Sequence, residues 1–515
     1  MELVFTLKQG LPKLAWIANV DLQEQRTMVS HGQWIEVFEQ GFVEGVWDGA
    51  FAGTAFDRTP NVFGSGAVVR GEEITFVSST STTDYLYWRS SESGSRVSVA
   101  NSLPLLLAAT DDELDPRVED YDLINDSILS GINRYVREIP TKNGVVNRLM
   151  HWNLRVALGE ISEQDKPLPP TFATFHDYFA YLSTTYGLLA TNAKDASRSN
   201  PLAIFSTQSK GYDSTAANAV AKNHGIDLVF TVTKGKGKGY FANEDRLVEV
   251  DDDGTAICAH FGLTCAQIER RALEVDSSME YLFYACMHAT GDFNLQQIGA
   301  HVERPTIVIT GCLGEIWYPA WYNIGQPDLL NADLVRGDLG NHGLTEVRLQ
   351  AGYGQLAFPY IGARSRADIF RITESEEMMP WRLQTTYDRP IPRRISEEAG
   401  LPRNMFGQVK MASVLEYPTP IIPIGDKLRR DYIAFLVQNR VLKRRQVFLL
   451  PVVQKWNAIV GMTSPKRHVW HYYLQRVISR LLRKPFSFPF VWRRVNGSIF
   501  CFCVNRRIKD YLGAL

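Results

Sequence analysis

The stretch Ile204–Thr215 (IFSTQSKGYDST) places small hydroxyl side chains, one glycine and one aspartate directly after an apolar run. A turn of this kind between a strand and a helix offers free backbone N–H groups and a partial positive charge, which suit a phosphate group. Gly211 lets the backbone approach a ligand closely. Ser209 and Ser214 add hydroxyl donors and Lys210 adds a positive charge, so the stretch is a candidate phosphate-binding loop.

Asp213 is the unusual member of this loop. A carboxylate beside phosphates is favourable mainly when Mg²⁺ lies between them. The pattern is not a Walker loop, since no GxxxxGK[ST] occurs, and Lys234–Tyr240 (KGKGKGY) fails that spacing and is interpreted as a flexible basic turn. Taken alone, the stretch is equally typical of a capped helix start.

The segments around the loop predict how it is positioned. From Thr174 onward, apolar runs alternate with amphipathic stretches, which is typical of a mostly parallel sheet covered by helices on both faces. In such sheets ligands bind outside the carboxyl ends of the strands. The expected strands are PLAIFS, IDLVFTVT, the short run Cys265–Ile268 and PTIVITG, and the expected helices are FHDYFAYLSTTYGLLATNA, Tyr212–His224, Thr255–Phe261 and Ser278–Thr290.

The remainder of the chain divides by composition. Residues 1 to about 115 alternate apolar and polar side chains between Gly- and Ser-rich turns, which predicts a β-rich α+β domain. The polar segment Thr110–Pro116 and the proline-rich Lys166–Pro170 are breaks. We therefore expect four regions: a β-rich domain at 1–115, a linker of uncertain structure at 116–173, an α/β domain at 174–425 and a basic helical region at 426–515.

Composition limits the class of protein. The chain has 515 residues, 45% hydrophobic and 22% charged, which is typical of a globular protein of two to four domains. Its start carries no signal-peptide pattern, and no window holds the roughly 20 apolar residues of a membrane-spanning helix. The six cysteines show neither zinc-knuckle nor redox spacing, so they are interpreted as buried reduced thiols of a cytoplasmic protein.

The pattern S-x-G-x-D-S after a strand resembles the pyrophosphate loop of the ATP pyrophosphatases, usually SGGxDS. This superfamily includes asparagine synthetase, the β-lactam and carbapenam synthetases, and the lasso-peptide cyclases. Lys210 stands where that motif has glycine. The resemblance implies an adenine nucleotide α-hydrolase-like fold, in which the loop holds the β- and γ-phosphates while a carboxylate attacks the α-phosphate.

Three further stretches resemble the same family in order. Residues 252–271 resemble its helix–glycine–strand segment. Thr306–Tyr318 (TIVITGCLGEIWY) resembles its TGxGxDE segment, with Gly311 in the loop and Glu315 as a metal ligand. Arg389–Ala412 resembles its late helical segment, in which Lys410 takes the place of the lysine that neutralises charge in the transition state.

The β-rich region adds to this resemblance. VEGVWDGAFAGTAFD (Val43–Asp57), EEITFVSSTSTTDYLYW and VANSLPLLLAA resemble the glutamine-hydrolysing (Ntn-type glutaminase) domain of asparagine synthetases, so that the likeness covers roughly residues 40 to 415. That domain uses a cysteine nucleophile at its mature N-terminus, whereas this chain begins Met1-Glu2-Leu3 and has no cysteine before Cys258. A thiol is essential to glutamine hydrolysis of this type, so we expect a degenerate domain without glutaminase activity.

The resemblance implies an asparagine synthetase-like, AMP-forming carbon–nitrogen ligase that uses ATP and Mg²⁺. Its substrates are a small-molecule, peptide or glycan carboxylate and an amine or ammonia. The expected catalytic residues are Lys410 and Asp213, and the expected metal ligands are Asp213 and Glu315. The expected nucleotide-binding residues are Ser209, Lys210, Gly211, Asp213, Ser214, Thr231, Thr233 and Gly311, with the two threonines meeting adenine or ribose through their backbone.

Two other functions stay open. One is a catalytically degenerate relative that acts as a membrane-associated binding or assembly protein, because Lys210 replaces a glycine and the acidic motif is reduced. The other keeps adenylation but activates a nucleic-acid base. No RNP, helix-turn-helix or zinc-finger pattern supports nucleic-acid binding.

The end of the chain differs in charge from the rest. From Lys427 onward there are 19 Lys and Arg residues against two acids, Asp431 and Asp510, whereas the first 426 residues carry 36 basic and 54 acidic residues. The tail is helical, amphipathic and rich in aromatic residues. Three interpretations remain: a cap on the acidic synthetase-like domain, attachment of 427–515 to the anionic inner face of a membrane, or contact with a polyanionic substrate.

Overall fold

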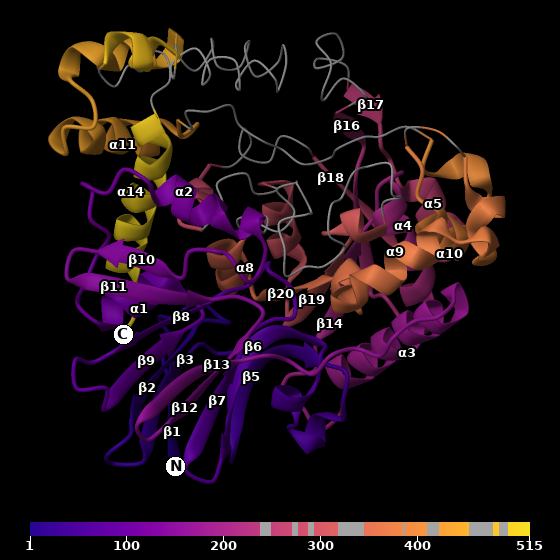
Figure 1. Cartoon of the computed structure of the whole chain (residues 1–515), viewed down its shortest axis with the longest axis horizontal. Coiled ribbons are helices and arrows are strands. Elements are labelled where there is room, and N and C mark those ends of the chain that lie inside the picture. Colours follow the sequence, from indigo (N-terminus) through magenta and orange to yellow (C-terminus); the bar gives the residue numbers. More distant parts are fainter. Residues whose placement is uncertain are drawn as a thin grey trace.

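The computed structural model describes residues 1–236, 249–269, 277–286, 293–317, 344–383, 385, 387–408, 422–452, 477–483 and 493–515. Within them the N-terminal residues form two stacked β-sheets, shown in indigo and purple in Figure 1, and the following residues form a parallel sheet with helices around it. The coarse expectation of a β-rich region followed by a mostly parallel α/β core agrees with this architecture.

The two N-terminal sheets pack face to face over an apolar core. Trp16 stands between them, because its indole ring stacks on Phe76 with centroids 6.1 Å apart and meets the edge of Phe42 at 4.9 Å. The first sheet has the order β1 (Glu2–Leu7), β3 (Arg26–His31), β2 (Trp16–Asp21), β9 (Arg96–Ala100), β8 (Leu86–Ser90), β11 (Gly144–Leu149) and β10 (Glu138–Thr141). The second has the order β13 (Glu160–Gln164), β12 (Asn153–Ala157), β7 (Glu73–Val77), β6 (Val62–Arg70), β5 (Gly41–Trp47) and β4 (Glu36–Phe38).

Residues 116–173, expected as a linker of uncertain structure, contribute strands to both sheets. β10 and β11 extend the first sheet through β8, and β12 and β13 extend the second through β7. These strands are only four to six residues long. Apolar alternation over so few positions is too short to identify a strand, and the strands to which these hairpins attach, β8 and β7, lie more than 50 residues away in sequence.

The third sheet is parallel throughout its described strands and has the order β18 (Cys265–Ile268), β15 (Leu228–Val232), β14 (Ala203–Thr207), β19 (Thr306–Thr310) and β20 (Tyr353–Ala357). The strands expected from the sequence in this part of the chain are confirmed, and so are the helices expected at 175–193, 212–224 and 255–261. The helix expected at Ser278–Thr290 is shorter, since α7 covers only Glu280–Tyr284, and residues 287–290 lie outside the described residues. A small hairpin of β16 (Lys234–Lys236) and β17 (Glu249–Asp251) follows the carboxyl end of β15.

Helix α3 (Phe175–Ala193) begins at a capping signal in the sequence, and helix α4 (Tyr212–Ala221) begins after Gly211. Thr174 Oγ1 accepts from the Asp177 N–H at 3.2 Å and Asp177 Oδ2 accepts from the Thr174 N–H at 2.9 Å, which is a reciprocal capping box. The other described α-helices are α1 (Leu103–Ala109), α2 (Tyr121–Asp126), α5 (Thr255–His260), α7 (Glu280–Tyr284), α8 (Thr345–Ala351), α9 (Arg366–Glu374), α10 (Pro390–Glu398), α11 (Asp426–Gln438) and α14 (Arg493–Leu512). None of the helices described in the chain is both long and apolar enough to cross a membrane.

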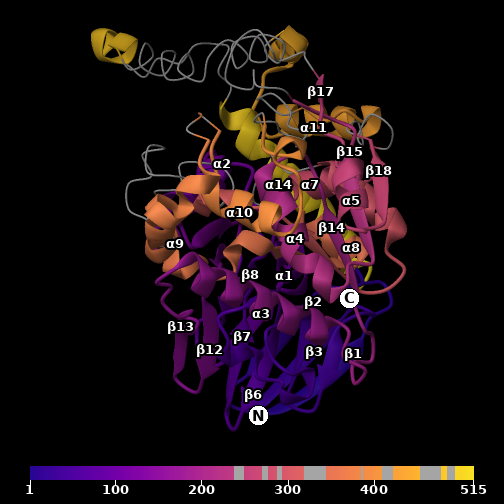
Figure 2. The same ribbon diagram turned by 90° about the vertical axis from the view of Figure 1, so that its right-hand side faces the viewer.

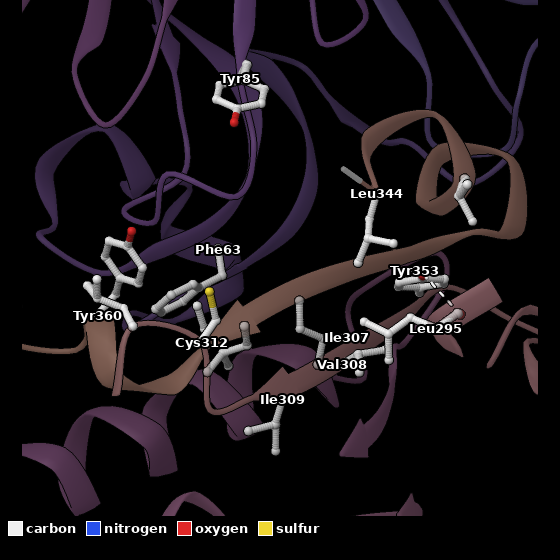
Figure 3. Close-up of a cluster of buried hydrophobic side chains, with 14 of the residues drawn as sticks. Phe63, Tyr85, Leu295, Ile307, Val308, Ile309, Cys312, Leu344, Tyr353 and Tyr360 are labelled. Carbon is white, nitrogen blue, oxygen red and sulfur yellow. Dashed lines mark hydrogen bonds between the residues drawn. The ribbon is translucent and has the colours of Figure 1, made fainter. Parts of the chain in front are cut away.

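A continuous buried core joins the sandwich to the parallel sheet. Phe63 of β6 lies beside Cys312 and Tyr360, next to the apolar side chains of β19 (Figure 3). Thr82 also reaches across, sharing a hydrogen bond of 2.5 Å with the Tyr360 hydroxyl. The two parts are therefore packed as one body and not joined only by a tether.

Helix α8 carries two charged side chains into this shared core. Arg348 Nη1 lies 3.1 Å from Glu44 Oε2 and its Nε lies 2.5 Å from Asp84 Oδ1, and all three side chains are fully buried. Burial raises the pKa of both carboxyl groups, and the guanidinium of Arg348 opposes this shift. Since Glu44 and Asp84 belong to the sandwich, Arg348 connects the two parts of the molecule by charge.

The last helix docks on the body instead of projecting from it. Arg507 of α14 pairs with Glu346 of α8 at 3.1 Å, and Tyr511 donates to the same carboxylate at 2.8 Å. Helix α11 lies on α14, where the Tyr432 hydroxyl donates to the Val495 carbonyl at 2.6 Å. Figures 1 and 2 both show α11 beside α14 at the upper side of the molecule. These two helices of the basic region are thus a structural cap.

Candidate functional site

The candidate loop connects β14 to α4, and Gly211 is the N-cap of that helix. Two hydroxyl groups fold the loop on itself. The Ser209 N–H donates to Ser214 Oγ at 3.1 Å, the two serine hydroxyls share a hydrogen bond of 3.0 Å, and the Gly211 N–H donates to Ser209 Oγ at 3.1 Å. The loop is therefore preformed at the carboxyl end of a central strand, with the positive end of a ten-residue helix behind it.

Asp213 lies in the first turn of α4 and packs against the loop that follows β19. A Cβ atom on Gly314 would lie 2.1 Å from Asp213 Cγ, and one on Gly311 would lie 2.8 Å from the Ser214 backbone nitrogen. Both positions therefore require glycine for close approach and not for backbone conformation. The two glycines bring the loop after β19 against the loop after β14.

Glu315 follows Gly314 directly, in the short 3₁₀ turn Gly314–Trp317, and only 5% of it is exposed. Asp213 and Glu315 therefore belong to one corner of the sheet edge. Within the residues that the structure describes, no three His, Cys, Asp or Glu side chains cluster closely enough to form a metal site by themselves. Two carboxylates nevertheless fit Mg²⁺, because this ion usually binds one or two protein carboxylates and takes its other ligands from phosphates and water.

Lys210 points away from the centre of the loop. Its Nζ lies 2.5 Å from Asp251 Oδ2, at the end of β17, and this hydrogen bond lowers the pKa of Asp251. Its backbone N–H donates to Asp252 Oδ1 at 2.8 Å, and Asp252 is buried. The Lys210 ammonium is thus held by an exposed acid at the rim, and the acidic segment after β17 fixes the backbone of the loop.

Thr231 and Thr233 at the end of β15 hold that acidic segment in place. Thr231 Oγ1 accepts from the Gly254 N–H at 2.8 Å, and the Thr233 carbonyl accepts from the Asp252 N–H at 3.2 Å. The expected contact of these threonines with adenine or ribose stays a prediction. Their observed partners show that they also position the segment that touches the loop.

The segment that leads to Lys410 reaches the loop as well. The Gly407 N–H donates to the Lys210 carbonyl at 2.8 Å, and a Cβ atom on Gly407, whose φ is +62°, would lie 2.4 Å from the Tyr212 ring. Lys410 itself lies outside the described residues, so its predicted role is not examined by the structure. Gly407, three residues before Lys410, therefore contacts the candidate phosphate-binding loop directly.

Two further side chains at the loop were missed from the sequence. A Cβ atom on Gly211 would lie 3.7 Å from the Tyr387 hydroxyl. Burial raises the pKa of Tyr387, Asp213 raises it further, and Arg389 lowers it. Arg389 is 1% exposed. The sequence contains no spacing signal for either residue, apart from the position of Arg389 at the head of the RPIPRR stretch that begins α10.

No family model matches the chain, and no curated protein matches it in sequence.

Proposed function

We propose that the protein is an ATP-dependent, AMP-forming ligase that joins a carboxylate to an amine or to ammonia. One observation supports this reaction above all: the loop Ser209–Ser214 and the turn at Gly311–Glu315 meet at the carboxyl edge of a parallel sheet, with Asp213 packed on Gly314. Backbone donors, hydroxyl groups and two carboxylates at such an edge suit a nucleotide phosphate chain with Mg²⁺. We assign the parallel sheet to the adenine nucleotide α-hydrolase-like fold on the same basis.

The reaction has two steps. A carboxylate oxygen bonds to the α-phosphorus of ATP while the bond from that phosphorus to the pyrophosphate oxygen breaks. The amine nitrogen then attacks the acyl carbon, AMP leaves with the electron pair of the C–O bond, and the nitrogen loses a proton. Mg²⁺, when bound, neutralises charge on the departing pyrophosphate.

The residues of the site take distinct roles in this proposal. Ser209, Gly211 and Ser214 bind pyrophosphate oxygens through hydroxyl and backbone donors. Asp213 and Glu315 hold Mg²⁺. Lys410 stabilises the charge that develops on the α-phosphate, where an ammonium is more effective in a site that excludes water.

Tyr387 supplies a hydroxyl beside Gly211, and Arg389, whose guanidinium carbon lies 5.5 Å from the centroid of the Tyr387 ring, supplies a positive charge behind it. We assign both to the same phosphate chain. Both groups are hydrogen-bond donors suited to phosphate oxygens.

The amine donor is free ammonia or an amino group in this proposal. Glutamine hydrolysis of the resembled type needs a thiol nucleophile. None of the six cysteines lies in the two N-terminal sheets. We therefore propose that the sandwich is a degenerate glutaminase-like domain with a structural role.

The direct test of the reaction is release of pyrophosphate. Purified protein is incubated with Mg²⁺-ATP and a panel of carboxylates, each with and without ammonia or amines, and pyrophosphate and AMP are measured. Equal amounts of both products, dependent on one carboxylate, are expected. Absence of both across a broad panel contradicts a working ligase.

The alternative, a catalytically degenerate binding or assembly protein, rests on the lysine at position 210 and on the reduced acidic motif at Glu315. Calorimetry with Mg²⁺-ATP separates the two functions. Micromolar, Mg²⁺-dependent affinity supports the ligase, whereas no measurable heat together with no pyrophosphate release supports the degenerate protein.

We expect Lys210→Ala to change the affinity for Mg²⁺-ATP by less than about fivefold, because exposed ion pairs contribute only about 0.2–1 kcal/mol and the ammonium pairs with Asp251 at the rim. The affinity is measured by calorimetry. Lys142→Ala is the matched control. Lys142 also pairs with a partly exposed acid, Glu113, and neither residue belongs to the candidate loop. A loss of thirtyfold or more in Lys210→Ala alone would mean that the ammonium contacts the phosphates.

We expect Gly314→Ala to lower the rate of pyrophosphate release by about 100-fold, because the added methyl group displaces the Asp213 carboxylate, and misplacing a reacting constellation by about 1 Å has effects of that size. The melting temperature is measured in parallel. Gly53→Ala is the control, since a Cβ atom there meets nothing within 4 Å. Unchanged activity in Gly314→Ala would show that Asp213 has no part in the reaction.

A further inference from the structure

The basic region, residues 426–515, has an exposed part that is distinct from the cap formed by α11 and α14. No Asp or Glu occurs from Tyr432 to Lys509, whereas 16 Lys and Arg residues do. Helices α11 and α14 bury their apolar residues against each other and against the body, as shown by Leu436, Phe500 and Val504. The described residues between them, 440–452 and 477–483, behave differently.

Apolar side chains in these two stretches face solvent. Of the sixteen large apolar side chains that are exposed in the described part of the chain, five lie within residues 444–452 and 477–483. Sixteen residues thus hold nearly a third of the exposed large apolar side chains, so these side chains are concentrated in two short stretches of the chain and not scattered along it. They are Phe448 at 69%, Val452 at 57%, Val477 at 44%, Leu481 at 78% and Leu482 at 56%.

The spacing of these residues places cations beside them. The 3₁₀ turn η14 (Arg444–Leu449) continues as helix to Val452, and Arg445, Phe448 and Val452 recur at intervals of three and four residues, which is one face of a helix. Residues 477–482 are also helical. They repeat the arrangement with Val477 and Leu481 four residues apart and with Arg480 and Arg483 beside them.

Helical turns with exposed Phe and Leu, flanked by arginine and free of acids, match the surface of an anionic bilayer. The apolar side chains enter the boundary between headgroups and acyl chains, and the arginines meet anionic headgroups. A nucleic acid or an acidic glycan offers the same negative charge but no apolar layer for Phe448, Leu481 and Leu482. The exposed apolar component is therefore what favours a membrane over another polyanion.

From this combination we infer that residues 440–452 and 477–483 provide two separate contacts of a peripheral docking surface for an anionic membrane. The surface is independent of the nucleotide site, which lies at the edge of the parallel sheet. In Figure 1 the described turns of this stretch lie at the top of the molecule, above α11 and outside the body formed by the three sheets. Docking there leaves the parallel sheet outside the bilayer.

The test uses the full-length protein and vesicle flotation. Vesicles of phosphatidylcholine with about one third phosphatidylglycerol are compared with vesicles of pure phosphatidylcholine. Binding to the anionic vesicles only is expected, and it weakens as salt rises from low to physiological concentration and above, because the headgroup attraction is screened.

Two double variants separate the contribution of the arginines from that of the apolar side chains. Arg444→Ala with Arg445→Ala is expected to reduce vesicle affinity about tenfold or more, since each basic residue near an anionic surface contributes severalfold. Phe448→Asp with Leu481→Asp is expected to abolish flotation. Leu158→Asp is the matched control, because Leu158 is 70% exposed in the turn between β12 and β13 and should leave binding unchanged.

Four outcomes would overturn the inference. The first three are no flotation with anionic vesicles, equal binding to pure phosphatidylcholine, and binding that survives both Phe448→Asp and Leu481→Asp. The fourth is preferential capture by heparin or duplex RNA in competition with the vesicles, since it identifies a polyanion as the partner. Pyrophosphate release in solution is measured for the same variants, so that loss of docking and loss of the ligase reaction are told apart.

Discussion

Asp213→Asn is expected to lower the rate of pyrophosphate release by at least about 100-fold while the protein stays folded. The asparagine keeps the shape of the side chain and its close packing on Gly314 and Gly311. It removes the negative charge that the proposed Mg²⁺ site requires. Charge stabilisation by a metal contributes several kcal/mol to a transition state, and each 1.4 kcal/mol is about a tenfold change in rate.

The measurement has three parts. Pyrophosphate release gives the rate, calorimetry gives the Mg²⁺-ATP affinity, and thermal unfolding shows that the fold is intact. Asp195→Asn is the control, because Asp195 lies in the turn before β14, at the opposite end of the same strand. A wild-type rate of pyrophosphate release in Asp213→Asn would show that the Asp213 charge is not needed for the reaction. An equal loss of rate in Asp195→Asn would indicate a general effect of charge.

The parallel sheet and the loop were accessible from the sequence because their signals are local. Ile204–Phe205 and Thr306–Thr310 are β-branched or apolar runs that end in glycine or hydroxyl residues, and Gly262 marks the end of a helix. Carboxyl ends of parallel strands meet at one edge. Residues as far apart as Ser209 and Glu315 were therefore expected together, and the close packing of Asp213 on Gly314 brings them together.

The rest of the site depends on long-range packing that leaves no local signal. Asp252 binds the Lys210 amide across 42 residues, and Tyr387 lies over Gly211 across more than 170. Lysine, aspartate and tyrosine at such positions are ordinary surface residues in a sequence. The outward direction of Lys210 in particular follows from Asp251, whose position is set by the β16–β17 hairpin.

The buried charged residues between the two parts of the molecule could not be predicted from the sequence either. The sequence around Arg348 (TEVRLQA) is typical of an exposed amphipathic helix, yet Glu346 and Arg348 are both buried. Each is compensated by partners from distant segments: Ser102, Arg507 and Tyr511 for the glutamate, and Glu44 and Asp84 for the arginine. Such networks emerge only when the complete fold is known.

Arg348→Met is therefore expected to destabilise the protein by about 3–5 kcal/mol, because it leaves the buried carboxylates of Glu44 and Asp84 without their cation. Arg26→Met is the control. Arg26 pairs with Glu2 at 3.6 Å on the surface, where such pairs contribute about 0–1 kcal/mol. Calorimetric unfolding is the measurement, and hydrogen exchange at the junction locates the loss, since a chain of this size need not unfold in one step.

The destabilisation should also depend on pH. Burial raises the pKa of Glu44 and Asp84, and without Arg348 nothing of opposite charge opposes that shift. A carboxyl group whose pKa is higher in the folded than in the unfolded state binds more protons when folded, so stability falls as pH rises. The difference in free energy of unfolding between Arg348→Met and wild type should therefore be small near pH 5 and larger at pH 8. A gap that is constant over this range, or that widens toward low pH, would mean that lost packing and not unpaired charge is responsible.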